Sequence, residues 1–463
     1  MSSIRFAIPS LAAGVLLVSC PSLPSAKSDE RDEGLEFGGE YASGRAPVPE
    51  LVGSLSDLFR DGELKKQIRL SQSKNPDLAE AAARLEEAGF NTRNARAGLF
   101  PSIDASGEAR RLKTNSSGGG NNFGSVITNS YSASLDAQWE VDVWGRIRAG
   151  VAAADADRNA VAADYAAASQ SIAAQTAQAY FDLIAAGKLE DLATRRLESF
   201  QNTLDLVNRR FELGTADLGE LDLARTDVET AKSTINQRRN SRDQASRDLA
   251  VLTGAYPDAS RTASDWPSLK RGVAAGIPST LLESRPDIFS AYQRIRAADA
   301  NVKVAHRDLF PKFSLTAGSG QQSSVLSNLA ESNFTVWSLV GGLAGPVIDG
   351  GERRAELGAA NARAKQALAS YRSTVLNAFR EVENALGSEQ YLKKQEEATA
   401  RALDAARSAE DRSLRNYESG LVEILTVLDA TRRRFTAEED LISLKNLRFQ
   451  NRVALALALG KAY

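Results

Sequence analysis

The sequence has very few of the side chains that enzymes most often use for chemistry. Its 463 residues include one His, one Cys and one Met. With only His306 and Cys20, the chain cannot build a catalytic triad, a CxxC pair or a zinc site from these residue types. Catalysis by carboxylates alone is compatible with this composition. We predict that the protein is not an enzyme and that it holds no cofactor and no metal.

The chain also lacks an excess of charge of either sign. It has 57 Lys and Arg against 59 Asp and Glu, which gives a formal net charge of −2. Because no basic excess is available to neutralise phosphates, we do not expect a nucleic-acid partner. Charged residues make up 25% of the chain and aromatic residues 6%. Together with abundant Ala, this composition favours long helices packed side by side over several bulky cores.

Long apolar runs are missing as well. The apolar run over 6–18 is too short to span a bilayer as a mature helix. Cys20 follows it closely, and residues 17–20 (LVSC) resemble the processing box of bacterial lipoproteins. We predict a signal peptide over 1–19 and lipidation of Cys20, which would hold the N-terminus to a membrane. An ordinary signal peptide that contains a chance Cys is the alternative.

The rest of the chain constrains how it could cross a membrane. The segment after Cys20 is rich in Pro, Ser, Gly and Asp, and we predict a lipidated, extended tether over 20–50. No later segment offers about 18 consecutive apolar residues, as a transmembrane helix requires. Because only helices and closed β-barrels satisfy every backbone hydrogen bond in lipid, any span must be a β-barrel.

The main organisational feature is an internal duplication. Residues 75–78 (NPDL) correspond to 285–288 (RPDI), an offset of 210, which is 286 minus 76. Residues 211–214 (FELG) correspond to 417–420 (YESG), an offset of 206, which is 420 minus 214. The length difference must lie between these motifs, and the Gly-, Ser- and Asn-rich loop predicted over 113–129 is the obvious place.

Each copy is predicted to contain the same elements in the same order. The first repeat covers 51–254 and the second covers 276–463, with a linker over 255–275. Within each repeat a helix leads into two alternating segments, and then a very long helix turns at Gly into a second long helix. The alternating segments predict β-hairpins at about 101–143 and about 311–344, so that each chain carries four strands.

The predicted strands have one apolar and one polar face. Residues 131–143 alternate over thirteen positions, with Tyr131, Leu135 and Trp139 on one side and Ser132 on the other. Such a strand fits lipid on one face and water on the other. A soluble sheet with one face on a helical layer is the alternative. The segments have about the length that a tilted membrane strand needs.

The positions of the aromatic residues indicate where the membrane surfaces would lie, and the number of strands indicates how many chains a pore needs. Phe100, Trp144, Phe310 and Trp337 lie mostly near the hairpin ends, where membrane-interface aromatics are expected. Four strands cannot close a barrel, and about eight leave no lumen. An open pore therefore requires several chains, and we favour a homotrimer with twelve strands.

The long helices are the other half of the predicted architecture. The segment over 146–212 has no Pro and one Gly, so a continuous helix would be about 100 Å long at 1.5 Å per residue. The segment over 352–418 is its counterpart. The returning helices carry apolar residues every seven positions, which indicates coiled-coil packing. These residues are Leu421, Leu428, Phe435, Ile442 and Phe449 in the second copy and Leu221, Val228 and Ile235 in the first.

Several motifs together make the chain similar to outer-membrane efflux factors of the TolC type. The carrying residues are Cys20 and the segments 276–288 (GIPSTLLESRPDI), 348–351 (IDGG) and 425–430 (LTVLDA), with the two LFP strand starts. They match the lipoprotein branch, which partners resistance-nodulation-division (RND) pumps. The resemblance implies a trimeric twelve-stranded barrel in the outer membrane, continuous with an α-helical coiled-coil tunnel through the periplasm. It also implies a tunnel that stays closed at its lower end until a partner opens it.

The resemblance further implies a gate at the periplasmic tip, where acidic side chains form rings. Asp429 matches one ring, and Glu220 matches the acidic position of the first copy. Thr426 stands where some members carry a second Asp, so that ring is in doubt. Alternatively, Asp429 is simply a solvated residue of a coiled coil.

The turns that join the long helices match the parts of the family that meet a periplasmic adaptor protein. In this chain they contain Gly214 and Thr215 in the first copy and Gly420 and Leu421 in the second. Capping of the helix ends by Gly explains the same residues and applies in either case.

The predicted function is therefore that of a passive outer-membrane duct in a tripartite efflux system. It would pass drugs or other toxic compounds from an inner-membrane RND-type transporter and a periplasmic adaptor to the exterior. An outlet for type I protein secretion is one alternative. A periplasmic coiled-coil lipoprotein that does not conduct is the other.

Overall fold

A computed structural model describes residues 58–117, 123–263, 265–267 and 284–460, which all belong to one unit that spans Gly38–Tyr463. The predicted signal peptide, Cys20 and the predicted tether lie outside the described residues. Among the residues that are described, no helix has a stretch long and apolar enough to cross a bilayer.

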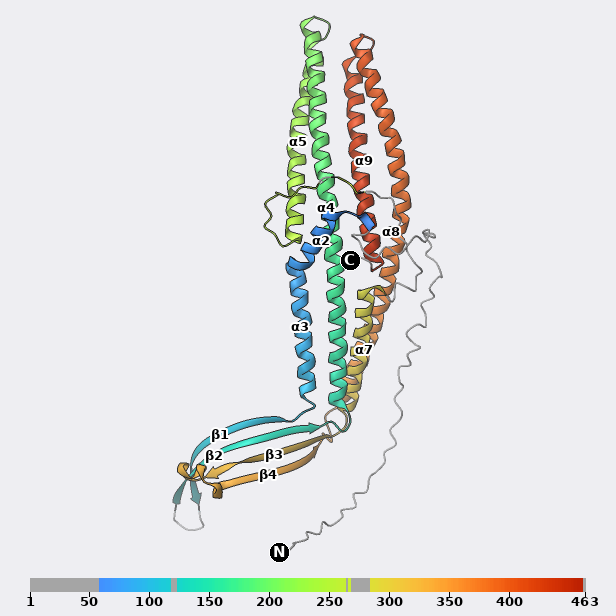
Figure 1. Cartoon of the computed structure of the whole chain (residues 1–463). Coiled ribbons are helices and arrows are strands. Elements are labelled where there is room, and N and C mark those ends of the chain that lie inside the picture. The colour runs from blue at the N-terminus through green and yellow to red at the C-terminus, as the bar shows by residue number, and fades with distance from the viewer. Residues whose placement is uncertain (1–57, 118–122, 264, 268–283, 461–463) are drawn as a thin grey trace. The chain divides into compact units, whose positions relative to one another are not determined.

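The first half of the chain contains two short helices, a hairpin and two long helices. They are α2 (Gly62–Lys74), α3 (Pro76–Ala97), β1 (Ser102–Ser117), β2 (Phe123–Val141), α4 (Arg146–Glu212) and α5 (Leu218–Leu252). The second half repeats this order with α7 (Pro286–Arg307), β3 (Lys312–Ser323), β4 (Thr335–Ala344), α8 (Glu352–Glu418) and α9 (Ile424–Ala458), and the short 3₁₀ turns Leu326–Ala330 and Ser332–Phe334 lie between β3 and β4. Figure 1 shows the two halves side by side.

The structure confirms the duplication. Helices α4 and α8 both have 67 residues, and α5 and α9 both have 35. Each long helix starts after a Gly in the left-handed region, Gly145 with φ 79° and Gly351 with φ 91°. Since α4 and α8 begin 206 positions apart, 352 minus 146, the length difference lies in the hairpins.

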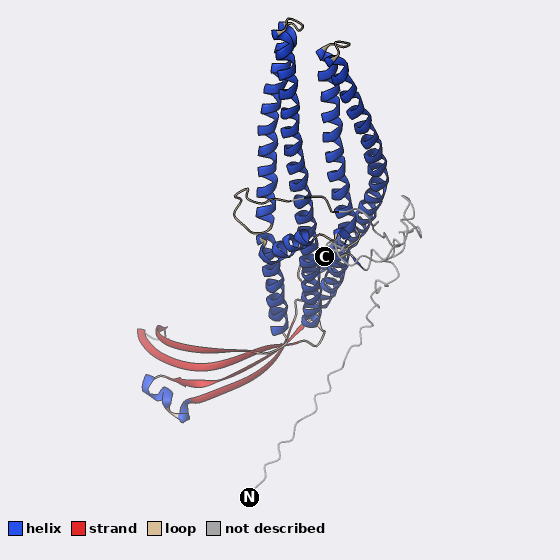
Figure 2. Cartoon of the chain, turned by 45° about the horizontal axis from the view of Figure 1, so that its top comes forward, coloured by secondary structure: helices blue, strands red, loops and turns tan. Residues whose placement is uncertain are grey.

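The four strands form one antiparallel sheet in the order β1-β2-β3-β4 (Figure 2). Residues that pair directly across an antiparallel ladder share a face. One row joins Ala105, Leu135, Ser319 and Trp337, and the next joins Asp104, Asp136, Gly318 and Ser338. The sheet therefore has an apolar and a polar face. The polar face lines a cavity of about 590 Å³.

The predicted loop over 113–129 is wrong for most of its length. Strand β1 continues to Ser117 and β2 begins at Phe123, with Lys113 paired to Ile127 and Thr114 to Val126. β-branched residues on the β2 side favour the extended backbone, and ladder hydrogen bonds do not require apolar side chains. This Gly- and Ser-rich segment therefore belongs mostly to the two strands, and the hairpin is longer than predicted.

The two halves of the chain pack together through two apolar clusters. The tip cluster lies near the turns that join the long helices and takes residues from α4, α5, α8 and α9: Phe200, Val207, Leu221, Ala224, Val228, Ala231, Tyr417, Ile424, Val427 and Leu428. The waist cluster lies about midway along α4 and contains Phe59, Leu64, Phe181, Ile184, Leu249, Phe449 and Val453 among others. In the described part of the linker, Trp266 stacks on Phe449 at 4.8 Å between ring centroids.

The heptad prediction is confirmed for most positions. Leu428, Phe435 and Phe449 on α9 are buried, as are Leu221 and Val228 on α5. Ile442 is only half-buried. Leu421 lies outside α9, which begins only at Ile424. It lies in the turn, and 74% of its surface is exposed.

Candidate functional site

The two turns between long helices are built alike and lie at the end of the helices away from the sheet (Figure 1). Gly214 (φ 71°) and Gly420 (φ 74°) both adopt the left-handed conformation that ends an α-helix. The N–H of Thr215 donates to the Arg210 carbonyl at 2.9 Å, and the N–H of Leu421 donates to the Asn416 carbonyl at 2.8 Å. Helix capping by Gly, which the sequence predicted alongside the docking role, is thereby confirmed.

Each turn also presents a large apolar side chain to solvent. Leu213 is 79% exposed and Leu421 is 74% exposed. Neither leucine contributes to the tip cluster. An exposed leucine in each of the two corresponding turns fits a docking role, which stays a prediction for Gly214, Thr215, Gly420 and Leu421.

Below the turns, an arginine and a tyrosine join the first hairpin to the second. The Arg210 guanidinium on α4 lies 4.3 Å from the ring centroid of Tyr417 on α8, and its Nη1 donates to the Tyr417 carbonyl at 2.9 Å. Tyr417 is almost completely buried. Burial raises the pKa of Tyr417, and the negative charge of Glu220 on α5 raises it further. The predicted gate residue Glu220 thus lies close to the tip of the other hairpin.

The predicted gate residues of the second copy lie in the first two turns of α9. Thr426 and Asp429 are both exposed. Asp429 is not a free acid, because Arg433 Nε donates to its Oδ2 at 2.7 Å. The sequence analysis did not predict this partner, although Arg433 follows Asp429 at the spacing of one helical turn. Whether Asp429, Thr426 and Glu220 surround a common axis depends on other copies of the chain and stays a prediction.

A second ion pair close to the tip is partly buried and links α5 to α9. Arg432 Nη2 donates to both carboxylate oxygens of Asp227, at 2.7 and 2.8 Å. Asp227 is buried in the tip region, with 7% of its surface exposed. Arg196 on α4 lies close by; burial lowers its pKa, and the negative charge of Asp227 opposes this effect. The Asp227 carboxylate thus lies near the positive charges of Arg432 on α9 and Arg196 on α4.

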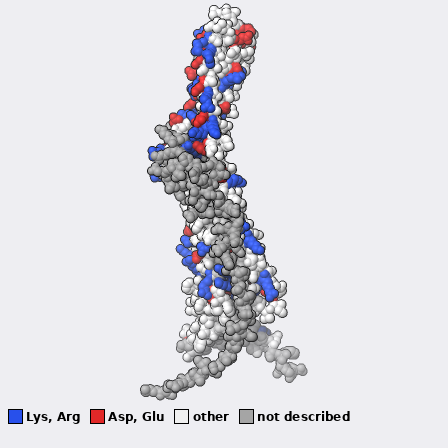
Figure 3. Space-filling view, turned by 90° about the vertical axis from the view of Figure 1, so that its right-hand side faces the viewer, with Lys and Arg blue, Asp and Glu red and all other residues white. Residues whose placement is uncertain are grey.

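Further ion pairs connect the two hairpins along their length. Arg195 on α4 pairs with Glu438 on α9 at 2.8 Å, and Arg238 on α5 pairs with Glu439. Burial works to raise the pKa of Glu438, but the hydrogen bond and charge of Arg195 and the other arginines around it hold that pKa below its usual range. Figure 3 shows both signs of charge interspersed along the helical part on the face in view.

The predicted interface aromatics lie toward the two ends of the sheet. At the end where the strands join the helices, Trp144 stacks on Phe310 with 5.1 Å between centroids, and its Nε1 donates to the Pro311 carbonyl at 2.7 Å. Phe100, just before β1, is exposed. Trp337 lies near the other end, as the third residue of β4, and is 79% exposed. The spacing fits two aromatic belts, and the interface role stays a prediction.

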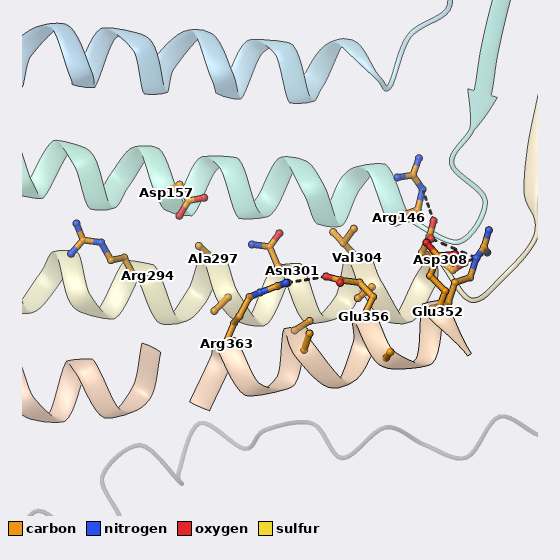
Figure 4. Close-up of a pocket in the computed structure, with 16 residues that line it drawn as sticks. Arg146, Asp157, Arg294, Ala297, Asn301, Val304, Asp308, Glu352, Glu356 and Arg363 are labelled. Carbon is orange, nitrogen blue, oxygen red and sulfur yellow. Dashed lines mark hydrogen bonds and ion pairs between the residues drawn. The ribbon is translucent and has the colours of Figure 1, made fainter. Parts of the chain in front are cut away.

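A cavity of about 1070 Å³ lies where α4, α7 and α8 approach the sheet (Figure 4). Its charged residues come in both signs. Arg363 pairs with Glu356 at 2.8 Å, and Arg146 lies 3.9 Å from Asp308. Such balanced charge offers no strong preference for an anion or a cation. Among the described residues, no group of three or more His, Cys, Asp or Glu could hold a metal ion.

Comparison with known proteins gives one consistent result. Residues 68–255 and 277–461 match the family model described as outer membrane efflux protein. The cation efflux system protein CusC of Escherichia coli O6:H1 is 32% identical over 410 residues, which cover 87% of this chain and 86% of that protein. The outer membrane protein OprJ of Pseudomonas aeruginosa is 29% identical over 98% of this chain and 95% of its own length.

Solved structures agree with these relatives. The outer-membrane channel OprN superposes with a TM-score of 0.86 at 27% identity, covering 92% of this chain and 97% of that chain. The fold class predicted from the sequence, a trimeric barrel joined to a helical tunnel with two repeats per chain, is confirmed by such neighbours. The resemblance found in the motifs is confirmed as well.

Proposed function

The chain belongs to the family of outer membrane efflux proteins and is an outer-membrane channel component of a tripartite efflux system, and we propose that it works as a passive duct for small molecules. The observation that carries the proposal is the sheet with one apolar and one polar face, joined directly to helices of 67 residues. Such a sheet can line a water-filled pore only when other chains complete it.

A homotrimer is the assembly we propose, with twelve strands in the outer membrane. The helical hairpins of the three chains would continue the pore through the periplasm to a periplasmic adaptor and an RND-type transporter. Support comes from the exposed tips and from the exposed apolar face of the sheet. Lipid attached to Cys20 would hold each chain to the membrane independently of the barrel. Energy would come from the inner-membrane transporter, because the duct itself has no chemistry.

The class of cargo is proposed from the names of the relatives together with the composition of this chain. CusC is named as a cation efflux system protein, whereas OprJ is named only as an outer membrane protein. This chain has no Met after Met1 and one Cys. Soft cations such as Cu(I) prefer thioether or thiolate ligands, so we propose organic small molecules rather than metal ions as cargo. A protein-secretion outlet would instead be encoded beside an ABC exporter.

Planar-bilayer recording of the purified trimer tests the duct. We expect discrete conductance steps, and we expect Asp429→Ala to increase the conductance several-fold because it removes the acidic group of the predicted gate on α9. The matched control is Asp404→Ala on α8, another exposed acid, which pairs with Arg407 on its own helix. Flat traces for all three proteins would favour a structural lipoprotein without a pore.

Adaptor docking at the tips leads to a separate prediction. Replacing both Leu213 and Leu421 with Ser is expected to weaken adaptor binding at least about tenfold, because burying one leucine contributes about 1.5–3 kcal/mol. Surface plasmon resonance with the cognate adaptor measures this. Tyr256→Ser removes an exposed apolar side chain far from both turns and is expected to leave the affinity unchanged. Equal affinity of the double variant and the wild type would place the docking surface elsewhere.

A further inference from the structure

Three consecutive arginines near the tip of α9 point in three different directions. Successive residues of an α-helix are about 100° apart around its axis. Arg432 reaches α5, where it pairs with Asp227. Arg434 reaches α8, where its Nε donates to Glu410 at 2.8 Å. Arg433 lies between these two directions, on the face of α9 that the chain's own helices leave uncovered.

Arg433 and Asp429 share this uncovered face and remain largely solvated. Their side chains are 75% and 60% exposed, although their charged groups lie 2.7 Å apart. A pair this exposed adds little to stability, so stability does not explain it. The same stripe includes Thr426 one turn before Asp429 and Thr436 one turn after Arg433, both exposed. Over these turns the stripe therefore carries one acid and one base.

We propose that Arg433 determines the ion selectivity of the periplasmic opening by neutralising the acidic ring of Asp429. The inference rests on the proposed duct, in which three copies of this stripe surround the axis. Each Asp429 would then be matched by an Arg433 one helical turn away. The screening length is about 10 Å at 0.1 M salt, which exceeds the separation of the two charges. A passing ion at that salt concentration feels both rings together, and their fields largely cancel.

The remaining charges near the tip set the baseline. The negative charge of Glu220 acts on Tyr417 of the other hairpin and leaves a moderate negative charge near the opening. Asp440 lies two turns beyond Arg433, about 10 Å further along α9. Arg432 and Arg434 are each engaged by acids on other helices. The wild-type channel should therefore be weakly cation-selective.

Reversal potentials of single variants in a KCl gradient across a planar bilayer test the inference. Arg433→Gln exposes the acidic ring and is expected to raise the K⁺/Cl⁻ permeability ratio roughly tenfold, the lower range of enrichment in a cleft of one sign. Asp429→Asn exposes the basic ring and is expected to shift the ratio toward Cl⁻ by a similar factor. Both shifts should shrink at about 1 M salt, where the screening length is about 3 Å.

The control is Arg412→Gln, which removes an exposed arginine from α8 at the same end of the molecule and is expected to leave the ratio unchanged. Opposite shifts for the two α9 variants support the proposal. Channels that conduct with an unchanged ratio in Arg433→Gln overturn it and leave the duct intact. A shift of the same size in Arg412→Gln also overturns it, because the effect would then not belong to the α9 stripe. Absence of conductance in the wild type would instead refute the proposed function, and the inference with it.

Discussion

Replacing Arg432 with Gln is expected to loosen the two helical hairpins from each other and to open the channel. The Asp227 carboxylate would lose a partner that holds both of its oxygens, at 2.7 and 2.8 Å. Removing one member of a buried ion pair typically costs about 3–5 kcal/mol, because the other charge stays buried. The Arg432 side chain is 46% exposed, so we expect about 2–4 kcal/mol here.

The consequence for conduction follows from where the pair lies. Arg432 and Asp227 connect α9 to α5 beside the tip cluster, close to the turns that would surround the periplasmic opening. Without the pair, the contact between α5 and α9 at this level depends mainly on the apolar tip cluster, because the other ion pairs between the hairpins lie further from the turns. We expect the mean conductance to rise at least several-fold and the thermal stability of the trimer in detergent to fall.

A double-mutant cycle separates the pair from its surroundings. Asp227→Asn combined with Arg432→Gln removes both charges and is expected to recover about half or more of the stability lost in Arg432→Gln. Arg225→Gln on α5 is the control, because Arg225 is exposed and pairs only within its own helix, with Asp222. If Arg432→Gln behaves like Arg225→Gln in both assays, the two hairpins do not depend on this pair.

The helical part of the fold could be read from the sequence because the decisive signals are local. The predicted long helices over 146–212 and 352–418 coincide with α4 and α8. Pro is absent inside them, and Gly at both ends supplies left-handed φ values that continue no helix. The duplication then allowed the elements of the second repeat to be predicted from those of the first. The strand faces were predictable for the same reason, since a period of two is a local property.

The contacts of the charged residues were not predictable in this way. Asp227, Arg432 and Arg196 lie far apart in the sequence, and nothing in a single helix indicates that they meet. Charged residues on a long helix usually face solvent, so Asp227 gave no sign of its burial. The partner of Asp429 was the exception, because Arg433 follows it at the spacing of one helical turn. The length of the first hairpin was not predicted. Its composition indicated a loop, but the pairing between β1 and β2 determines how far the strands extend.

Replacing Gly254 with Ala is expected to destabilise the protein by about 3 kcal/mol or more. At this point the end of α5 packs against the junction of α2 and α3. A Cβ on Gly254 would lie 2.3 Å from the Lys74 carbonyl oxygen, which is far inside contact distance. Its φ of 66° adds about 1–2 kcal/mol for any L-residue, and overpacking typically costs about 1–3 kcal/mol.

The second repeat contains the same arrangement. A Cβ on Gly460 would lie 2.5 Å from the Ser284 carbonyl oxygen, and its φ is 69°. Asn75 Nδ2 donates to the Leu252 carbonyl at 3.0 Å in the first repeat, and Arg285 Nη1 donates to the Ala458 carbonyl at 2.9 Å in the second. Gly460→Ala is therefore expected to match Gly254→Ala in size.

Two other glycines separate backbone strain from steric overlap. Gly214 also has a positive φ, but a Cβ there would meet nothing within 4 Å, so Gly214→Ala should cost only about 1–2 kcal/mol. Gly187 lies inside α4 with open space around it, and Gly187→Ala should stabilise the helix by about 0.5–1 kcal/mol. Thermal unfolding of the four variants in detergent gives the order. If Gly254→Ala lost no more stability than Gly214→Ala, overlap with Lys74 would be absent, and the close contact between the end of α5 and the α2–α3 junction would have to be abandoned.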